Sequence, residues 1–164
     1  MKVRIAFYKY NKKVINAAIS IWTWPFNRKT PAYSHAEIGI QINDEWKYFS
    51  STFREGTRWI KAKDMFKHPE RWDVYEKEVS DQTPIIERAN KIIGKGYDFA
   101  GILGFFTLFG LINDKKRWYC SEACYYVFTG KWKKRISPRR LYKRIKLLGF
   151  KKLNEKNFLT NSEI

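Results

Sequence analysis

Cysteine and long apolar runs are both scarce in this chain of 164 residues. Its longest apolar run, residues 101–112, falls well short of the roughly 20 residues that span a bilayer, so we expect a buried helix, a lid or a channel wall there. The first ten residues alternate apolar and polar side chains and lack the apolar stretch of a secretory signal. We therefore expect a cytoplasmic protein whose two cysteines, Cys120 and Cys124, are reduced.

Acidic residues are also few, because 16 of them face 33 lysines and arginines and leave a net charge of +17. Residues 131–152 contain eleven basic residues and no acidic one. Such a segment is either a solvated helix face or a surface that attracts nucleic acid, anionic lipid or an acidic polymer, and charge alone does not choose among these. The candidate anion-binding residues are Arg139, Arg140, Lys143 and Arg144.

Hydrophobic residues make up 44% of the chain and aromatic residues 18%, which excludes a disordered protein. The length suits one domain with a sizeable core and is too short for two. We therefore expect a monomer with a single domain over residues 1–150 and a C-terminal tail over residues 151–164.

Alternating and helical patterns predict a mixed α+β fold. Proline at a first turn and glycine past an end mark several of the helices. The expected strands are residues 2–8, 34–42, 45–52, 56–61 and 71–79, and the expected helices are residues 13–22, 84–93, 97–111, 121–128 and 138–148.

Asn43 and Asp44 predict a two-residue hairpin turn between the second and third strands. In that register Ser50 lies opposite Glu37, and both share a sheet face with His35 and Thr52. The other face carries apolar side chains and belongs to the core. The polar face therefore gathers an imidazole, a carboxylate and hydroxyls, as the wall of an active site would.

Cys120 precedes the expected helix 121–128, where free backbone N–H groups favour an anion and make a thiol nucleophilic. Cys124 lies one turn further on, at a position typical of a buried, inert thiol. A nucleophilic cysteine needs a base, and His35 lies among polar partners, whereas His68 precedes a proline in a charged loop and is expected at the surface. Two histidines without suitable spacing do not predict a zinc site.

Four segments together resemble the permuted NlpC-type branch of the papain-like cysteine hydrolases, whose relatives include YiiX-like and lecithin retinol acyltransferase-like proteins. These segments are SHAEIGI, GYDFAG, WYCSEACYYVF and ISPRRLYKRI. The resemblance implies an antiparallel sheet packed against the helix that bears the cysteine. In that branch the histidine precedes the cysteine, as His35 precedes Cys120 here.

The resemblance also implies roles for single residues. Cys120 is the expected nucleophile and His35 its general base, while Tyr97 and Ser34 are expected to contact substrate. For the third, polar member, we rank Glu37 first and Ser50, at the position where relatives commonly have a carboxylate, second. Ser50 is otherwise a substrate contact.

The predicted activity is hydrolysis of an amide or ester, by a peptidase or amidase, or acyl transfer, on a peptide- or lipid-like substrate, without metal or organic cofactor. The rival prediction is a basic protein that binds nucleic acid or a membrane surface and keeps the papain-like frame without catalysis. Nucleic acid is the less favoured of these partners.

Overall fold

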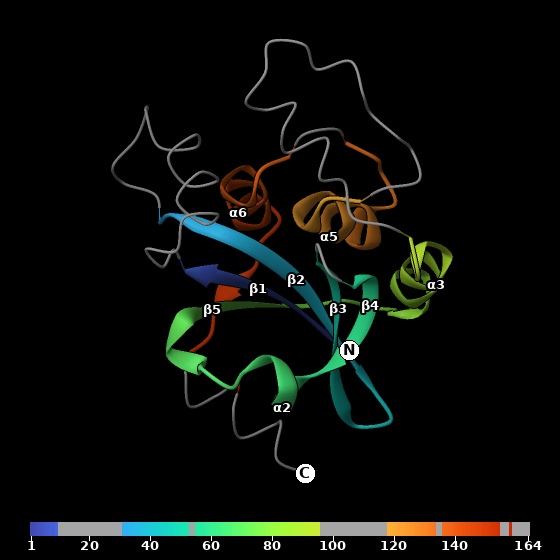
Figure 1. Cartoon of the computed structure of the whole chain (residues 1–164), viewed down its shortest axis with the longest axis horizontal. Helices are drawn as coiled ribbons and strands as arrows, with labels where there is room; N and C mark the ends of the chain where they lie inside the picture. Colours follow the sequence, from blue (N-terminus) through green and yellow to red (C-terminus); the bar gives the residue numbers. More distant parts are fainter. Residues whose placement is uncertain (10–30, 53–54, 96–117, 134–135, 155–157, 159–164) are drawn as a thin grey trace.

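One antiparallel sheet of six strands organises the molecule, in the order β4-β3-β2-β1-β5-β6 (Figure 1). The computed structural model describes residues 1–9, 31–52, 55–95, 118–133, 136–154 and 158. The strands are β1 (Lys2–Lys9), β2 (Tyr33–Ile42), β3 (Glu45–Thr52), β4 (Gly56–Lys61), β5 (Trp72–Glu78) and β6 (Lys151–Lys152).

Helices lie on both faces of this sheet and make the fold α+β. On one face lie α3 (Thr83–Ile92), α5 (Cys120–Thr129) and α6 (Pro138–Leu147), whereas α2 (Ala62–Met65) and a 3-10 turn (Pro69–Arg71) lie at the other (Figure 1). The helix that begins at Cys120 packs directly on β2 and β3. None of the helices in the described ranges is long and apolar enough to span a bilayer.

Two apolar cores result from the alternation of side chains along the strands. The larger core joins β1 and β2 residues such as Val3, Ile5 and Ile38 to Ala123 and Val127 of α5. The smaller core, on the other face, is rich in aromatic side chains and contains Ala6, Trp46, Tyr48, Phe66, Trp72 and Phe158. The apolar face predicted for β2 is therefore confirmed as part of the core.

The predicted hairpin is confirmed from its turn to the pair of Ile38 and Phe49. Ile42 pairs with Glu45 and Ile38 with Phe49, in the register that a two-residue turn requires. Asn43 and Asp44 have φ of 51° and 60°, the left-handed conformation that a type I′ turn needs at both positions. Asparagine and aspartate tolerate this conformation better than most residues, which explains the turn.

Helix ends also follow the sequence signals. Ser137 caps α6 by accepting a hydrogen bond from the backbone N–H of Arg140, and Pro138 occupies the first turn. Gly94, Gly130 and Gly149 follow α3, α5 and α6, each with positive φ. The expected helices over 13–22 and 97–111, and the apolar run 101–112, lie outside the described residues.

Two features of the expected C-terminal tail differ from the prediction. Residues 151–152, assigned to a tail, pair with Tyr75 and Glu76 of β5 as the short strand β6. Phe158 is 1% exposed and packs in the smaller core. The part of the expected tail that the structure describes therefore adds to the domain.

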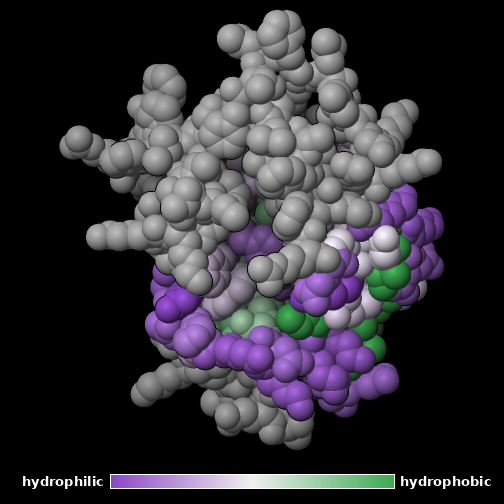
Figure 2. All heavy atoms as spheres, viewed as in Figure 1, coloured by the Kyte–Doolittle hydropathy of each residue, from purple (hydrophilic) through white to green (hydrophobic). Residues whose placement is uncertain are grey.

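Most described residues in the view of Figure 2 are hydrophilic at the surface.

Candidate active site

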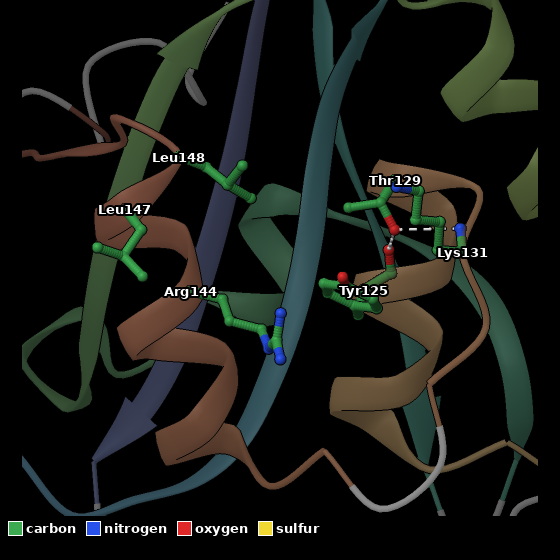
Figure 3. Close-up of a pocket in the computed structure, with 6 residues that line it drawn as sticks. All are labelled: Tyr125, Thr129, Lys131, Arg144, Leu147 and Leu148. Atoms are coloured by element: carbon green, nitrogen blue, oxygen red, sulfur yellow. Dashed lines mark hydrogen bonds between the residues drawn. The ribbon is translucent and has the colours of Figure 1, made fainter.

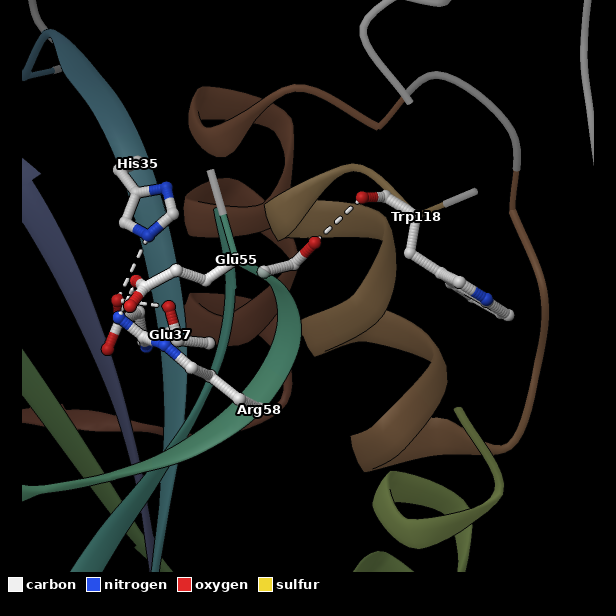
Figure 4. A network of polar contacts seen from close by, with 7 residues as sticks. His35, Glu37, Glu55, Arg58 and Trp118 are labelled. Carbon is white, nitrogen blue, oxygen red and sulfur yellow. Dashed lines mark hydrogen bonds and ion pairs between the residues drawn. The ribbon is translucent and has the colours of Figure 1, made fainter. Parts of the chain in front are cut away.

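His35 and Glu37 lie two residues apart on β2 and contact each other directly. Nε2 of His35 is 3.0 Å from Oε1 of Glu37, and the imidazole is 22% exposed whereas the carboxylate is nearly buried (Figure 4). Residues two apart on a strand share one face, which explains why the pair meets. Trp72 of β5 presents its ring to the imidazole at a centroid distance of 6.4 Å.

Ser50 of β3 completes a small polar cluster. Its hydroxyl donates a hydrogen bond of 2.7 Å to the same Oε1 atom of Glu37. Glu37 and Ser50 are the residues that come directly after the paired Ile38 and Phe49, so the hairpin register brings them close together. Glu37 therefore touches the imidazole, whereas Ser50 reaches it only through Glu37.

Cys120 is the first residue of α5, as expected. Tyr119 occupies the N-cap position with extended backbone and, within the described part of the chain, gives no side-chain cap to the helix. The first N–H groups of a helix have no acceptor inside it, so those of Cys120 and its neighbours are available to an anion. The start of α5 is tied to the sheet, because Ser51 of β3 donates a 2.7 Å hydrogen bond to the carbonyl of Trp118 (Figure 4).

The imidazole of His35 is influenced by two titratable neighbours, Glu37 and Cys120, and both change its pKa. Burial alone would lower the pKa, but the charge and hydrogen bond of Cys120, followed by those of Glu37, raise it from 6.5 to about 10. Both neighbours therefore favour the protonated imidazole over the neutral one.

The two cysteines differ in their surroundings although each is 1% exposed. Cys124 lies inside the larger core, and burial, followed by the charges of Cys120 and Glu37, raises its pKa well above the usual value. Both thiols are free. Of the two, only Cys120 acts on the imidazole of His35.

The other predicted substrate residues lie as follows. Ser34 is 3% exposed and precedes His35 at a point where the register between β1 and β2 shifts, a bulge of the kind that reorients side chains. Its hydroxyl has no hydrogen-bond partner among the described residues. Tyr97 lies outside the described residues. His68 is 64% exposed, which confirms its expected surface position.

The predicted anion-binding residues do not all share one environment. Arg140 and Lys143 are exposed on α6, and Arg144 is partly exposed beside the ring of Tyr125. Arg139 is only 8% exposed and has an interaction inside the molecule. The expectation of an anion-binding surface therefore applies to the other three, and Arg139 is removed from it because its side chain is buried.

Two buried polar side chains near Glu37, those of Arg4 and Tyr48, were not predicted from the sequence. They lie on the sheet face that carries Glu37, in the adjacent row of paired residues. Arg4, Gly39 and Tyr48 pair across β1, β2 and β3, and Ala6 and Glu37 pair in the next row of that face. Arg4 is 2% exposed, lies 3.8 Å from the ring centroid of Trp46 and pairs with Glu76 at 2.9 Å. The available signal in the sequence was Arg4, which shares a face with Ala6 in a strand that is otherwise largely apolar, because a buried arginine needs polar partners.

Within the described ranges, no group of three His, Cys, Asp or Glu side chains is placed to hold a metal ion. Comparison of the chain with protein-family models and with curated proteins found no match.

Proposed function

We propose that this protein is a cysteine hydrolase that cleaves an amide or ester bond, with a papain-like frame of the permuted NlpC type. The observation that carries the proposal is that His35 contacts Glu37 directly, while Cys120, the first residue of α5, is the group that most raises the pKa of the imidazole. A nucleophile, a base and an orienting carboxylate together form the constellation that activates a thiol. The position of Cys120 at the start of a helix packed on the sheet supports the papain-like frame.

The geometry supports a two-step reaction. The thiolate of Cys120 attacks the substrate carbonyl, and the oxyanion that forms is held by the backbone N–H of Cys120 and a further donor. The imidazolium of His35 gives its proton to the leaving amine or alcohol as the carbon–heteroatom bond breaks. His35 then takes a proton from water, which attacks the thioester, releases the acid and restores the thiol. A second alcohol or amine in place of water makes the reaction a transfer.

Glu37 orients the imidazole in this scheme. Its Oε1 atom accepts from both His35 and Ser50, so the carboxylate is held in one position while it stabilises the imidazolium. We therefore assign Glu37 the third position and Ser50 a supporting one. This follows the ranking expected from the sequence.

A second candidate function is a cationic binding protein that keeps this frame without catalysis. The burial of Cys120, which is 1% exposed, favours it, because a nucleophile must meet its substrate. The net charge of +17 supplies the attraction for an anionic partner.

One experiment separates the two functions. The full chain is treated with an activated thiol-directed acyl probe, and adducts are detected by intact mass for wild type, Cys120→Ala and Cys124→Ala. The enzyme proposal expects one acyl group on wild type and on Cys124→Ala, and none on Cys120→Ala. An unmodified wild type, or equal labelling of both variants, would favour the binding protein.

A further inference from the structure

Large apolar side chains are exposed next to the cations at the end of α6. Leu147 is 88% exposed, Leu148 37% and Trp132 44%, and these are three of the five large apolar residues that are exposed among the described residues. Lysines are next to two of them in the sequence, since Lys131 and Lys133 flank Trp132 and Lys146 precedes Leu147, and residues 131–152 contain no acidic residue. We call this surface the α6 tip and define it by the cationic and leucine residues that line two hollows there: Lys131, Lys133, Arg140, Lys143, Arg144, Leu147 and Leu148.

Two hollows flank Leu147 and give the α6 tip its shape. One, of about 320 Å³, is lined by Tyr125, Thr129, Lys131, Arg144, Leu147 and Leu148 (Figure 3). The other, of about 390 Å³, is lined by Lys133, Ile136, Arg140, Lys143, Arg144 and Leu147. Arg144 and Leu147 line both hollows. Cationic and aliphatic groups therefore alternate over one continuous surface.

We propose that the α6 tip docks on an anionic phospholipid bilayer. Lysine and arginine side chains are attracted to the negative surface of such a bilayer, and an exposed leucine at their centre can enter the boundary between headgroups and acyl chains. The two hollows have the cationic lining that lipid phosphates require.

A nucleic acid fits this surface less well. Phosphate binding explains the cations, but a leucine that is 88% exposed has no partner on a phosphate backbone. The apolar centre therefore distinguishes the two partners that charge alone leaves open.

The test is co-sedimentation of the full chain with vesicles of phosphatidylcholine alone or mixed with phosphatidylglycerol, at moderate salt. The wild type should sediment with the anionic vesicles and not with the neutral ones. Leu147→Ser should weaken vesicle binding several-fold, whereas the matched control Ile93→Ser, at an exposed isoleucine after α3, should not. The double variant Arg140→Glu with Lys143→Glu should abolish binding, and Lys63→Glu with Lys67→Glu, beside α2, should reduce it only slightly.

A parallel titration with duplex DNA checks the alternative. The proposal expects Leu147→Ser to leave DNA binding unchanged while vesicle binding falls. Equal vesicle binding by Leu147→Ser and Ile93→Ser, or tighter binding to DNA than to anionic vesicles, would overturn it. Membrane docking does not require the thiol, so the Cys120→Ala variant should bind vesicles as the wild type does, whether or not the proposed hydrolase activity is found.

A second inference concerns the row of side chains next to Glu37. Tyr48 reaches across Gly39, since a β-carbon at Gly39 would lie 2.5 Å from the Tyr48 ring. Burial raises the pKa of Tyr48, and the charges of Arg4 and then Glu37 act on it. Arg4 Nη1, Tyr48 OH and Glu37 Oε2 are all buried without a hydrogen-bond partner among the described residues.

The geometry points to Tyr48 as a positioning residue for Glu37. This rests on the proposed hydrolase function. Arg4 lies in the same row of the sheet as Tyr48. Tyr48 lies in the row of the sheet next to Glu37, and Oε2 is the Glu37 oxygen without a partner among the described residues, since Oε1 is occupied by His35 and Ser50. Buried polar atoms normally have partners, so two donors and an acceptor gathered in adjacent rows are expected to act together.

Tyr48→Phe keeps the ring over Gly39 and removes only the hydroxyl. We expect single-turnover acylation several-fold slower than wild type and a lower pKa of His35 by NMR titration. Tyr75→Phe, which removes a buried hydroxyl of the larger core, is the matched control and should change neither. An unchanged His35 pKa in Tyr48→Phe would overturn this inference. Absence of acylation in the wild type would instead overturn the hydrolase proposal, and the His35 pKa would still report on Tyr48.

Discussion

At the scale of single residues, His35 is the group on which the proposed chemistry depends. We expect His35→Ala to slow single-turnover acylation by roughly 10²- to 10⁴-fold, because the imidazole both activates the thiol and protonates the leaving group. The matched control is His68→Ala, since His68 is 64% exposed. A wild-type rate in His35→Ala, with the Tm of both variants unchanged, would exclude the proposed dyad.

Glu37 and Ser50 both help to orient His35, and they should differ in how much each contributes to the rate of acylation. Glu37→Gln should slow acylation less than His35→Ala does and more than Ser50→Ala, because Glu37 touches the imidazole and Ser50 acts through Glu37. Acylation rates of the three variants, measured at one pH with an activated ester, give the order. If Ser50→Ala were the slower of the two orienting variants, the assignment of the third position to Glu37 would be wrong.

The raised pKa of His35 links the site to stability. Its pKa is 6.5 when unperturbed and about 10 in the fold, so protonated His35 stabilises the fold fully below pH 6.5 and this stabilisation is lost as pH rises to about 10. Urea unfolding should therefore show that the free energy of unfolding of the wild type exceeds that of His35→Ala by an amount that shrinks as pH rises across that range. A difference that stays constant with pH would show that His35 titrates alike in both states.

At the scale of elements, the β2–β3 turn sets the register of the site. Asp44 has φ of 60°, so Asp44→Val should cost about 1–2 kcal/mol of unfolding free energy, because a β-branched residue is strained there. Asp44→Gly is the control and should be neutral or stabilising. Urea unfolding measures both variants. Equal stabilities would mean that the turn does not depend on the left-handed conformation.

The same hairpin shows how far sequence carries the prediction. Turn chemistry and alternation are local, so they gave the register and brought His35, Glu37 and Ser50 to one face. The burial of Cys120 and Arg139 depends on packing between distant segments, which no local pattern encodes. The strand β6 has only two residues, too few for an alternation to be visible.

At the scale of the whole molecule, the net charge of +17 destabilises the compact folded state, because like charges repel one another. Sodium chloride should therefore raise the Tm at neutral pH, by about 2–4 °C for each kcal/mol of repulsion that is screened. A variant with Lys131, Lys133, Arg140 and Lys143 changed to glutamate should respond less, because much of the local repulsion is already gone. A Tm that falls with salt in the wild type would mean that its ion pairs outweigh the repulsion.

The position of β1 in the sheet has a consequence for how the chain folds. β2, β3 and β4 are consecutive neighbours, whereas β1 lies between β2 and β5, and β5 follows all of them in the chain. Contacts between distant segments form slowly, because a long loop must close before they are made. We expect the β2–β3–β4 meander to form early and β5 to join β1 late. Trp72 arrives with β5, so this part of the surroundings of His35 forms only when the late pairing of β5 with β1 is made.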